Sequence, residues 1–191
     1  MTLDLYTADI DSVSFSDIEG FLGMRSPVDL RPTEGVLLDF KVSDSGDWVD
    51  SVTAFANTAG GILLLGVDSD KSQNNAPTAV PGIVVAGGDI KARLTSTLVS
   101  RVIPRPEFDL AAIPLPKDPS RVIAIVRVRE GQYPPYSWSK SGNRSRFPIR
   151  VEDTSRDATL RDLETLFQKR TAFGESTESR IQSFFTAPLF P

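Results

Sequence analysis

The sequence predicts an α+β fold in which a mixed central sheet is flanked by helices. Residues 62–67 are continuously apolar, which is typical of a central strand buried on both faces. Apolar residues recur at intervals of three and four over residues 48–58 and 90–102, which predicts two amphipathic helices. The apolar segments 108–115 and 122–128 are joined by a Pro-Lys-Asp-Pro-Ser turn, which predicts a β-hairpin.

A short helix and a first strand are expected before the central strand. Ser16 and the glutamate three positions later form a capping box, which predicts a helix over 16–24. Residues 36–42 are apolar and β-branched, and they predict a strand with Asp39 and Lys41 on one face.

The helix over 48–58 should end at Gly60 and Gly61, because glycine favours the left-handed conformation that ends helices. The central strand then brings Asp68 to its carboxyl end. The polar residues 69–81 predict a loop or a mobile hairpin, and residues 82–85 a brief strand.

The second half begins with the clearest helix, which Asp89 can cap and which Pro104 ends. After the predicted hairpin, residues 131–143 form an aromatic, proline-rich loop, and residues 146–151 predict a further strand.

Asp157 is the expected cap of a last helix. Its inward-facing residues are expected to be Leu160, Leu163, Leu166 and Phe167. We divide the chain into an N-terminal extension (1–14), one domain (15–170) and a C-terminal helix or tail (171–191).

Composition excludes several classes of site. Of the 191 residues, 40% are hydrophobic and 24% charged, as in an ordinary globular protein. The absence of cysteine excludes disulfides and thiolate chemistry, and the absence of histidine excludes imidazole bases, so any metal must bind to oxygen atoms. We recognise no targeting signal and no membrane-spanning segment, and a cytoplasmic location fits.

The charge is unevenly distributed along the chain. The formal net charge of −4 argues against a protein that coats nucleic acid through its overall charge. Residues 1–70 contain 13 acidic and 3 basic residues, whereas residues 121–150 contain seven basic residues and one glutamate. The later segment is therefore the candidate site for a polyanion.

Three segments in order carry a family resemblance: Glu34-Gly-Val-Leu-Leu-Asp39-Phe-Lys41, then Ala54-Phe-Ala-Asn57-Thr-Ala-Gly60-Gly61-Ile-Leu-Leu-Leu-Gly-Val-Asp68, then Ile103-Pro104. They resemble the pattern of the Schlafen-type AlbA domain over roughly residues 15–170. The resemblance implies an α+β module that binds nucleic acid, RNA or DNA, in a regulator or an RNA-processing protein. Asp39 stands where the family usually has a second glutamate.

The resemblance also implies an alternative activity, a divalent-metal-dependent endoribonuclease that uses Glu34, Asp39 and Asp68. Clustered carboxylates bind Mg²⁺ or Mn²⁺, which stabilises charge on a transferred phosphate. On a straight strand Glu34 and Asp39 would lie about 16 Å apart, so sharing a metal requires a bend, which Gly35 could permit. The simpler interpretation is that Asp39 pairs with Lys41 or an arginine and that Asp68 caps a turn.

Asn57, Gly60 and Gly61 allow two interpretations. They could form the cap between a helix and a closely packed strand, or their backbone amides could line a phosphate site.

The basic segment is the main candidate for nucleic-acid contact. Cations can hold phosphates while Tyr136, Trp138 and neighbouring aromatic side chains stack on unpaired bases, which favours single-stranded or structured RNA. The candidate cations are Lys41, Arg127, Arg129, Lys140, Arg144, Arg146 and Arg150. Alternatively, the aromatic residues pack on the sheet and the arginines pair with the acidic first third.

A third hypothesis is an interaction module without nucleic acid, which forms a homo-oligomer or holds a protein partner through the tail 171–191. The low isoelectric point, about 4.9, would suit such a module.

Overall fold

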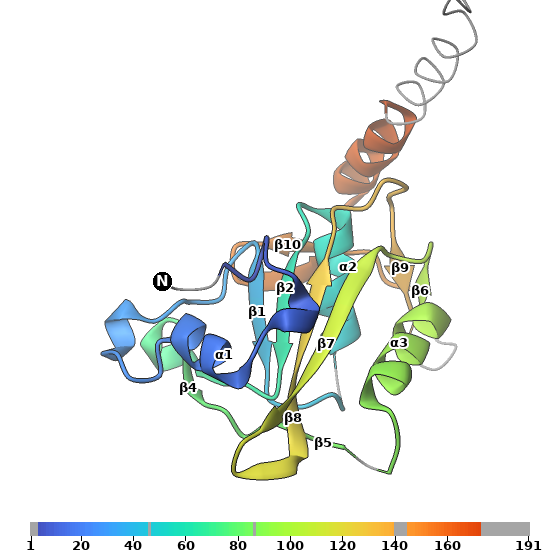
Figure 1. Ribbon diagram of the computed structural model, residues 1–191. Coiled ribbons are helices and arrows are strands. Elements are labelled where there is room, and N and C mark those ends of the chain that lie inside the picture. The colour runs from blue at the N-terminus through green and yellow to red at the C-terminus, as the bar shows by residue number, and fades with distance from the viewer. Residues whose placement is uncertain (1–3, 46, 86, 140–144, 173–191) are drawn as a thin grey trace, which may run out of the picture.

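The computed structural model describes residues 4–45, 47–85, 87–139 and 145–172, and the structural statements below refer to these residues. A twisted sheet lies at the centre, with helices on both of its faces (Figure 1). The helices are α1 (Phe15–Leu22), α2 (Trp48–Asn57) and α3 (Ile90–Arg101), with single turns η1 (Ile10–Ser12), η2 (Val28–Leu30) and η3 (Lys71–Gln73). The strands are β1 (Leu38–Lys41), β2 (Gly61–Leu65), β3 (Asp68–Asp70), β4 (Ala76–Ala79), β5 (Ile83–Val84), β6 (Val102–Ile103), β7 (Phe108–Leu115), β8 (Asp118–Val128), β9 (Ser137–Trp138), β10 (Pro148–Val151) and β11 (Thr154–Asp157).

The central sheet is mixed, as predicted. β1 pairs with β2 in parallel, and β2 pairs with β8 antiparallel. β7 lies along the other side of β8, and β5 pairs with the first half of β8. Three two-stranded sheets, β3–β4, β6–β9 and β10–β11, surround it. The fold class is therefore α+β, with helices flanking the sheet.

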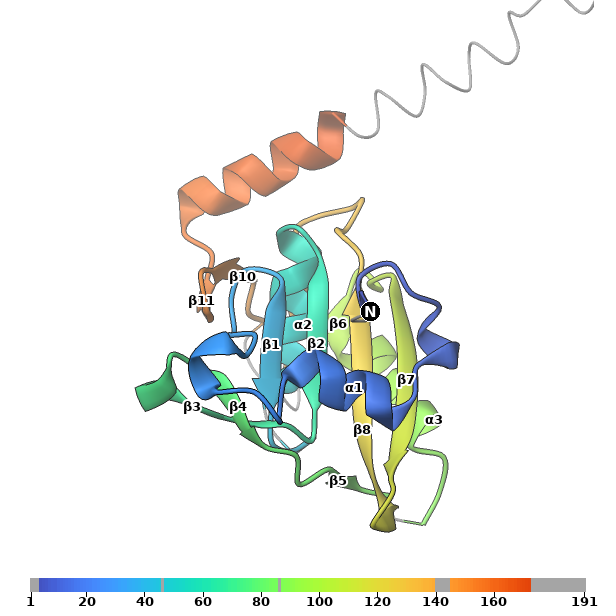
Figure 2. The ribbon, with the colours of Figure 1, turned by 60° about the vertical axis from the view of Figure 1, so that its left-hand side comes forward.

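Both faces of the sheet are buried, which explains why β2 and β8 are apolar throughout. Side chains of a strand alternate between its two faces. Leu63, Leu65, Ala124 and Val126 pack with α2 and α3 on one face. Ile62, Leu64, Ile123 and Ile125 pack with α1 on the other face. Figure 2 shows α1 in front of the sheet and α2 behind it.

The described part of the predicted N-terminal extension packs against the domain. Leu5, Ile10 and Val13 are buried in the same cluster as α1. The capping box of α1 is formed by Ser14 and Asp17, two residues earlier than the predicted Ser16 box.

The helix and hairpin predictions in the middle of the chain are confirmed. α2 occupies residues 48–57, and Asp89 caps α3 by accepting hydrogen bonds from two backbone amides. β7 and β8 form the predicted hairpin. Residues 69–81, predicted as a loop or a hairpin, contain the hairpin β3–β4.

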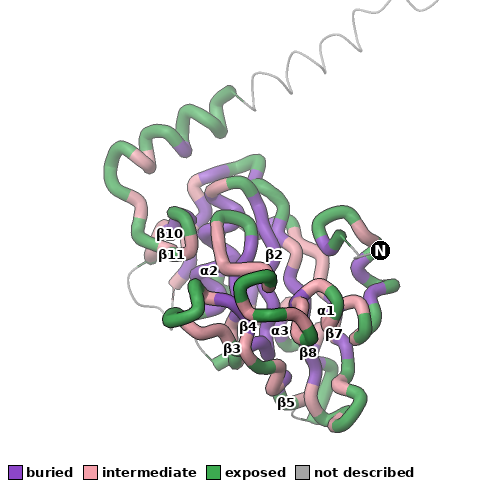
Figure 3. The backbone as a smooth tube through the Cα atoms, turned by 90° about the vertical axis from the view of Figure 1, so that its left-hand side faces the viewer, coloured by how far each residue is buried: buried purple, intermediate pink, exposed green. Residues whose placement is uncertain are grey.

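The last helix differs from its prediction in its cap and in its buried face. It begins at residue 160 and is described to residue 172. Thr159 caps it through a reciprocal pair of hydrogen bonds with Asp162, so Asp157 is not the cap. Leu166 is buried, but Leu160 and Phe167, predicted to face inward, are 75% and 53% exposed. Figure 3 shows this helix mostly exposed, whereas α2 is buried along its length.

The part of the chain that the structure describes contains no helix with the length and apolarity that crossing a membrane requires.

Candidate functional site

A pocket of about 540 Å³ opens beside β1 and the first turn of α2. Its other walls come from the turn between β3 and β4 and from the β10–β11 hairpin. Five carboxylates and three cations line it. The carboxylates are Glu34, Asp39, Asp47, Asp50 and Asp153, and the cations are Lys41, Lys71 and Arg150. The pocket is therefore acidic.

Glu34 and Asp39 line this pocket together because the chain turns between them. The Gly35 amide donates to the carbonyl of Leu38 at 2.9 Å, and the Glu34 carboxylate accepts from the Phe40 amide at 3.0 Å. The turn predicted to be necessary therefore exists. Gly35 is not required for it, because its φ is not positive and a Cβ there would meet no atom within 4 Å.

Asp39 is buried between two cations. Its Oδ1 accepts from Arg150 at 3.3 Å, and the Lys41 ammonium lies 2.7 Å from its Oδ2. That ammonium donates to the Phe40 carbonyl, and Oδ2 receives no hydrogen bond from any described residue. Arg150 also donates to the Gly35 and Leu38 carbonyls and lies over the Phe55 ring. Asp39 therefore pairs with both Lys41 and an arginine, as the simpler interpretation of the sequence predicted.

The environment of Glu34 disfavours its charge. Burial and the neighbouring Asp39 carboxylate raise the pKa of Glu34, although the Phe40 amide opposes this change. Ser69 also donates to Glu34, at 3.3 Å.

Asp68 does not join the other two predicted carboxylates. It is exposed on β3 and does not line the pocket. Among the described residues, no three side chains of the histidine, cysteine, aspartate or glutamate types are arranged to hold a metal ion. The predicted Mg²⁺ or Mn²⁺ ligand set does not fit this arrangement, and we derive no step through a metal.

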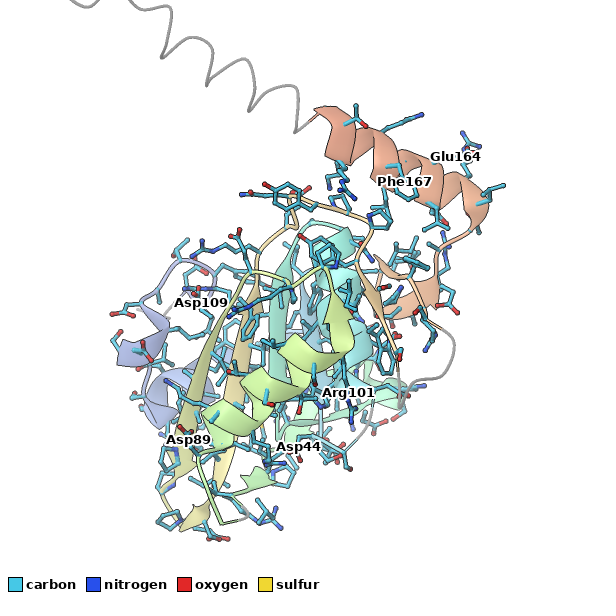
Figure 4. All side chains as sticks on the ribbon, turned by 90° about the vertical axis from the view of Figure 1, so that its right-hand side faces the viewer. Asp44, Asp89, Arg101, Asp109, Glu164 and Phe167 are labelled. Carbon is cyan, nitrogen blue, oxygen red and sulfur yellow. The ribbon has the colours of Figure 1, made fainter. Side chains whose placement is uncertain are left out.

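Arg127 and Arg129 lie beside acidic residues at the start of β7, namely Asp109 on the strand and Glu107 just before it. Arg127 donates to Asp109 at 2.8 Å and to the Ala8 carbonyl at 2.7 Å, and its side chain is mostly covered. Arg129 lies 3.7 Å from Glu107 and 3.8 Å from Asp109, beyond hydrogen-bond distance, and is 64% exposed. Figure 4 labels Asp109 on this side of the molecule.

Arg146 and Trp138 bind the same buried carboxylate. Asp50 accepts from the Trp138 indole at 2.7 Å and lies 3.0 Å from an Arg146 nitrogen. Asp157 accepts a hydrogen bond from Arg146 at 3.1 Å. Burial raises the pKa of Asp50, although the hydrogen bond from Trp138 and the positive charge of Arg146 oppose this rise. Arg146 thus links α2 to the strand that precedes the last helix.

The expected stacking surface is corrected by the structure. Tyr136 and Trp138 are each 2% exposed and belong to the core beside α2 and α3, so they present no ring to a base. Arg127, Arg146 and Arg150 each pair with an aspartate at hydrogen-bond distance. The predicted Lys140 and Arg144 lie outside the described residues.

Arg105, which sequence reasoning missed, shares a shallow hollow with Arg129. The hollow has a volume of about 330 Å³ and also includes Glu107, Phe108 and Asp109. Arg105 is exposed, and within the described ranges its side chain makes no hydrogen bond or ion pair. It lies in the short segment between β6 and β7, outside the basic segment 121–150 on which the sequence prediction concentrated.

Comparison with protein families identifies one family. The profile described as "Schlafen, AlbA_2" matches residues 34–159, which is more than half of the chain. The chain belongs to the Schlafen AlbA_2 family. A search of curated proteins found no match to this Schlafen AlbA_2 chain.

One solved structure similar to this Schlafen AlbA_2 domain is the N-terminal domain of a Nitrosomonas europaea protein described as related to the ATP-dependent DNA helicase RecG. The two are 21% identical, the match covers 66% of this chain and 86% of that one, and the TM-score is 0.44.

The central motif of this Schlafen AlbA_2 domain has structural roles. The Asn57 amide donates to the carbonyls of Tyr136 and Pro148, each at 2.8 Å, and accepts from the Tyr136 amide at 2.6 Å. Gly60 has φ +74°, donates to the Phe55 carbonyl, and would place a Cβ 2.7 Å from the Val128 carbonyl. Of the two interpretations, the structural one holds for Asn57 and Gly60.

Proposed function

We propose that this Schlafen AlbA_2 domain binds nucleic acid, with single-stranded RNA as the first candidate, through the hollow that Arg105 and Arg129 line. Membership of a family read as nucleic-acid-binding carries the proposal. The two arginines supply its location.

Arg105 and Arg129 are available to a ligand, whereas the other described arginines of the predicted surface, Arg127, Arg146 and Arg150, are paired with aspartates. A phosphate can displace solvent from Arg129 without breaking a hydrogen-bonded ion pair, because its nearest carboxylate atoms are 3.7 Å and 3.8 Å away. Binding at Arg150 would require removal of a buried ion partner from Asp39, which is strongly unfavourable. Arg127 supports the hollow by neutralising Asp109, which otherwise would repel a phosphate.

Tyr133 adds a candidate stacking residue. It follows Arg129 by four positions and is 52% exposed, in contrast to the buried Tyr136. A base stacked on an aromatic ring contributes about 1 to 3 kcal/mol. A phosphate on Arg129 and a base on Tyr133 would suit an unpaired strand.

A fluorescence anisotropy titration of labelled single-stranded RNA over a range of salt concentrations tests the binding. Each phosphate neutralised on a single strand contributes about 0.7 to the slope of log affinity against log salt, so two arginines predict a slope of about −1.4. Matched single-stranded and duplex DNA serve as comparison ligands. An affinity that does not change with salt, or no binding to any of the three ligands, would contradict the proposal.

A further inference from the structure

Within the part of the chain that the structure describes, no other segment covers one face of the helix over residues 160–172. In Figures 1 and 2 it extends away from the sheet, and in Figure 4 Glu164 and Phe167 lie on it. Phe167 is 53% exposed and Leu160, seven positions earlier, is 75% exposed. Residues seven apart lie on one side of a helix, so these two apolar side chains form one stripe.

The opposite side of the helix attaches it to the domain. Leu166 is buried there, and Lys169 donates to the Thr58 carbonyl at 3.2 Å and pairs with Glu130. The attachment fixes which side of the helix faces solvent. The exposed stripe is therefore not the side that the domain itself covers.

Opposite charges flank Phe167 symmetrically. Glu164 precedes it by three positions and Arg170 follows it by three, and residues three apart are neighbours on a helix surface. Both are exposed, and neither has a hydrogen bond or ion pair with another described residue. Asp162 on the same helix differs from these two residues, because its carboxylate already accepts hydrogen bonds from Thr159 and Arg156.

We propose that this face binds a second copy of the chain, with the two 160–172 helices antiparallel about a two-fold axis at Phe167. In a two-fold interface the same patch serves both subunits, and a contact between two positions occurs twice. An antiparallel pair centred on Phe167 places Glu164 of each chain opposite Arg170 of the other. The two phenyl rings meet at the axis, with an ion pair on either side.

Charge complementarity selects a second copy over an unrelated occupant. An acidic peptide would meet Glu164, and a basic one would meet Arg170, whereas the reversed copy of this helix matches both. One short helix on each side buries less surface than a standard permanent interface. The dimer should therefore depend on protein concentration.

Sedimentation velocity of the full chain over a concentration series is the test. Glu164→Arg and Arg170→Glu should each weaken dimerisation by about tenfold or more, because each change creates two like-charge contacts in a symmetric dimer. The double variant exchanges the charges and should recover most of the wild-type association. Phe167→Ala should also weaken it. None of these side chains is buried, so the circular dichroism spectrum should not change. The thermal unfolding midpoint should also not change when it is measured at a concentration at which the wild-type chain is monomeric, because dimerisation itself would raise it.

Arg161→Glu is the matched control, because it makes the same charge change on the same helix at a position about 120° around from Phe167. It should leave dimerisation within about twofold of wild type, the level expected for an unpaired surface charge. A chain that is monomeric at every concentration would overturn the proposal. So would single reversals that leave a dimer intact, or a double variant that dimerises no better than the single variants.

Discussion

Asn57 connects segments that lie far from it in the sequence. From the last turn of α2 its side chain contacts the backbone at residues 136 and 148, and it is itself buried. These hydrogen bonds hold the segment with Tyr136 and Trp138 against the helix. One amide side chain thus helps to remove from solvent the aromatic rings that the sequence suggested for base stacking.

Replacing Asn57 with alanine should lower the free energy of unfolding by about 2 to 4 kcal/mol, because it leaves several buried backbone groups without partners. Urea denaturation measures the change. Gln73→Ala is the control, since the Gln73 amide is exposed and makes one long hydrogen bond, and it should change stability by less than about 0.5 kcal/mol. Equal effects of the two substitutions would contradict the role of Asn57.

Glu34 should make stability depend on pH. Its folded pKa is raised above the ordinary value of 4.5, so the folded state holds the proton more tightly than the unfolded state. The stability that this gives is present below pH 4.5 and is lost as pH rises through the raised pKa. The side chain of the Glu34→Gln variant cannot ionise, so the variant does not lose stability in this way as pH rises. It keeps an oxygen that can accept from the Phe40 amide.

The stability difference between Glu34→Gln and wild type should therefore grow in favour of the variant as pH rises from about 4.5 towards neutrality. Urea denaturation at a series of pH values measures it. A difference that stays constant, or that falls with pH, would show that the folded state does not disfavour the charge on Glu34.

At the scale of elements, hydrophobic periodicity predicted the main helices and the strands of the central sheet, but not the short strands β6, β9 and β11. Local capping patterns did not define the ends of the helices. Both Ser14 and Ser16 have an acidic residue three positions later, and the chain begins α1 after Ser14. Both Asp157 and Thr159 could precede the last helix. Caps of this kind differ by about 1 kcal/mol or less, so packing of the helix on the core decides between them.

α3 is the element whose cap was predicted correctly. Asp89 accepts hydrogen bonds from the amides of Lys91 and Ala92. Asp89→Ala should lower the free energy of unfolding by about 1 kcal/mol. Asp89→Asn should lower it by much less, because asparagine caps helices nearly as well as aspartate. Thermal or urea unfolding compares the two, and an asparagine variant as unstable as the alanine variant would exclude the cap as the cause.

The pairing of the arginines could not be predicted from element positions alone. Asp109 stands opposite Arg127 only in the observed register of the β7–β8 hairpin, and a shift of one residue would place it elsewhere. Arg150 reaches Asp39 across 111 positions in the chain. Contacts at such separations depend on the tertiary fold. The sequence therefore indicated Arg129 but not Arg105, and it could not show which of the candidate arginines remained available.

At the scale of the whole molecule, the acidic first third and the basic segment 121–150 meet in space. Arg146 pairs with Asp50 and Arg150 pairs with Asp39, so much of the local positive charge is neutralised within the fold. For Arg146 and Arg150, the structure therefore agrees with the alternative prediction that the arginines pair with acidic residues of the first third of the chain. Arg105 and Arg129 are the cations of the hollow that keep solvent access, and nucleic-acid binding should depend on them.

The most direct measurement is the affinity for single-stranded RNA of the Arg105→Ala/Arg129→Ala double variant beside Lys117→Ala. Lys117 is an exposed cation in the turn at the opposite end of the β7–β8 hairpin, so it controls for the loss of charge. We predict that the double variant binds at least about tenfold more weakly than wild type at low salt and loses most of the salt dependence, while Lys117→Ala binds as wild type does. Equal affinities of all three proteins would contradict binding at this hollow.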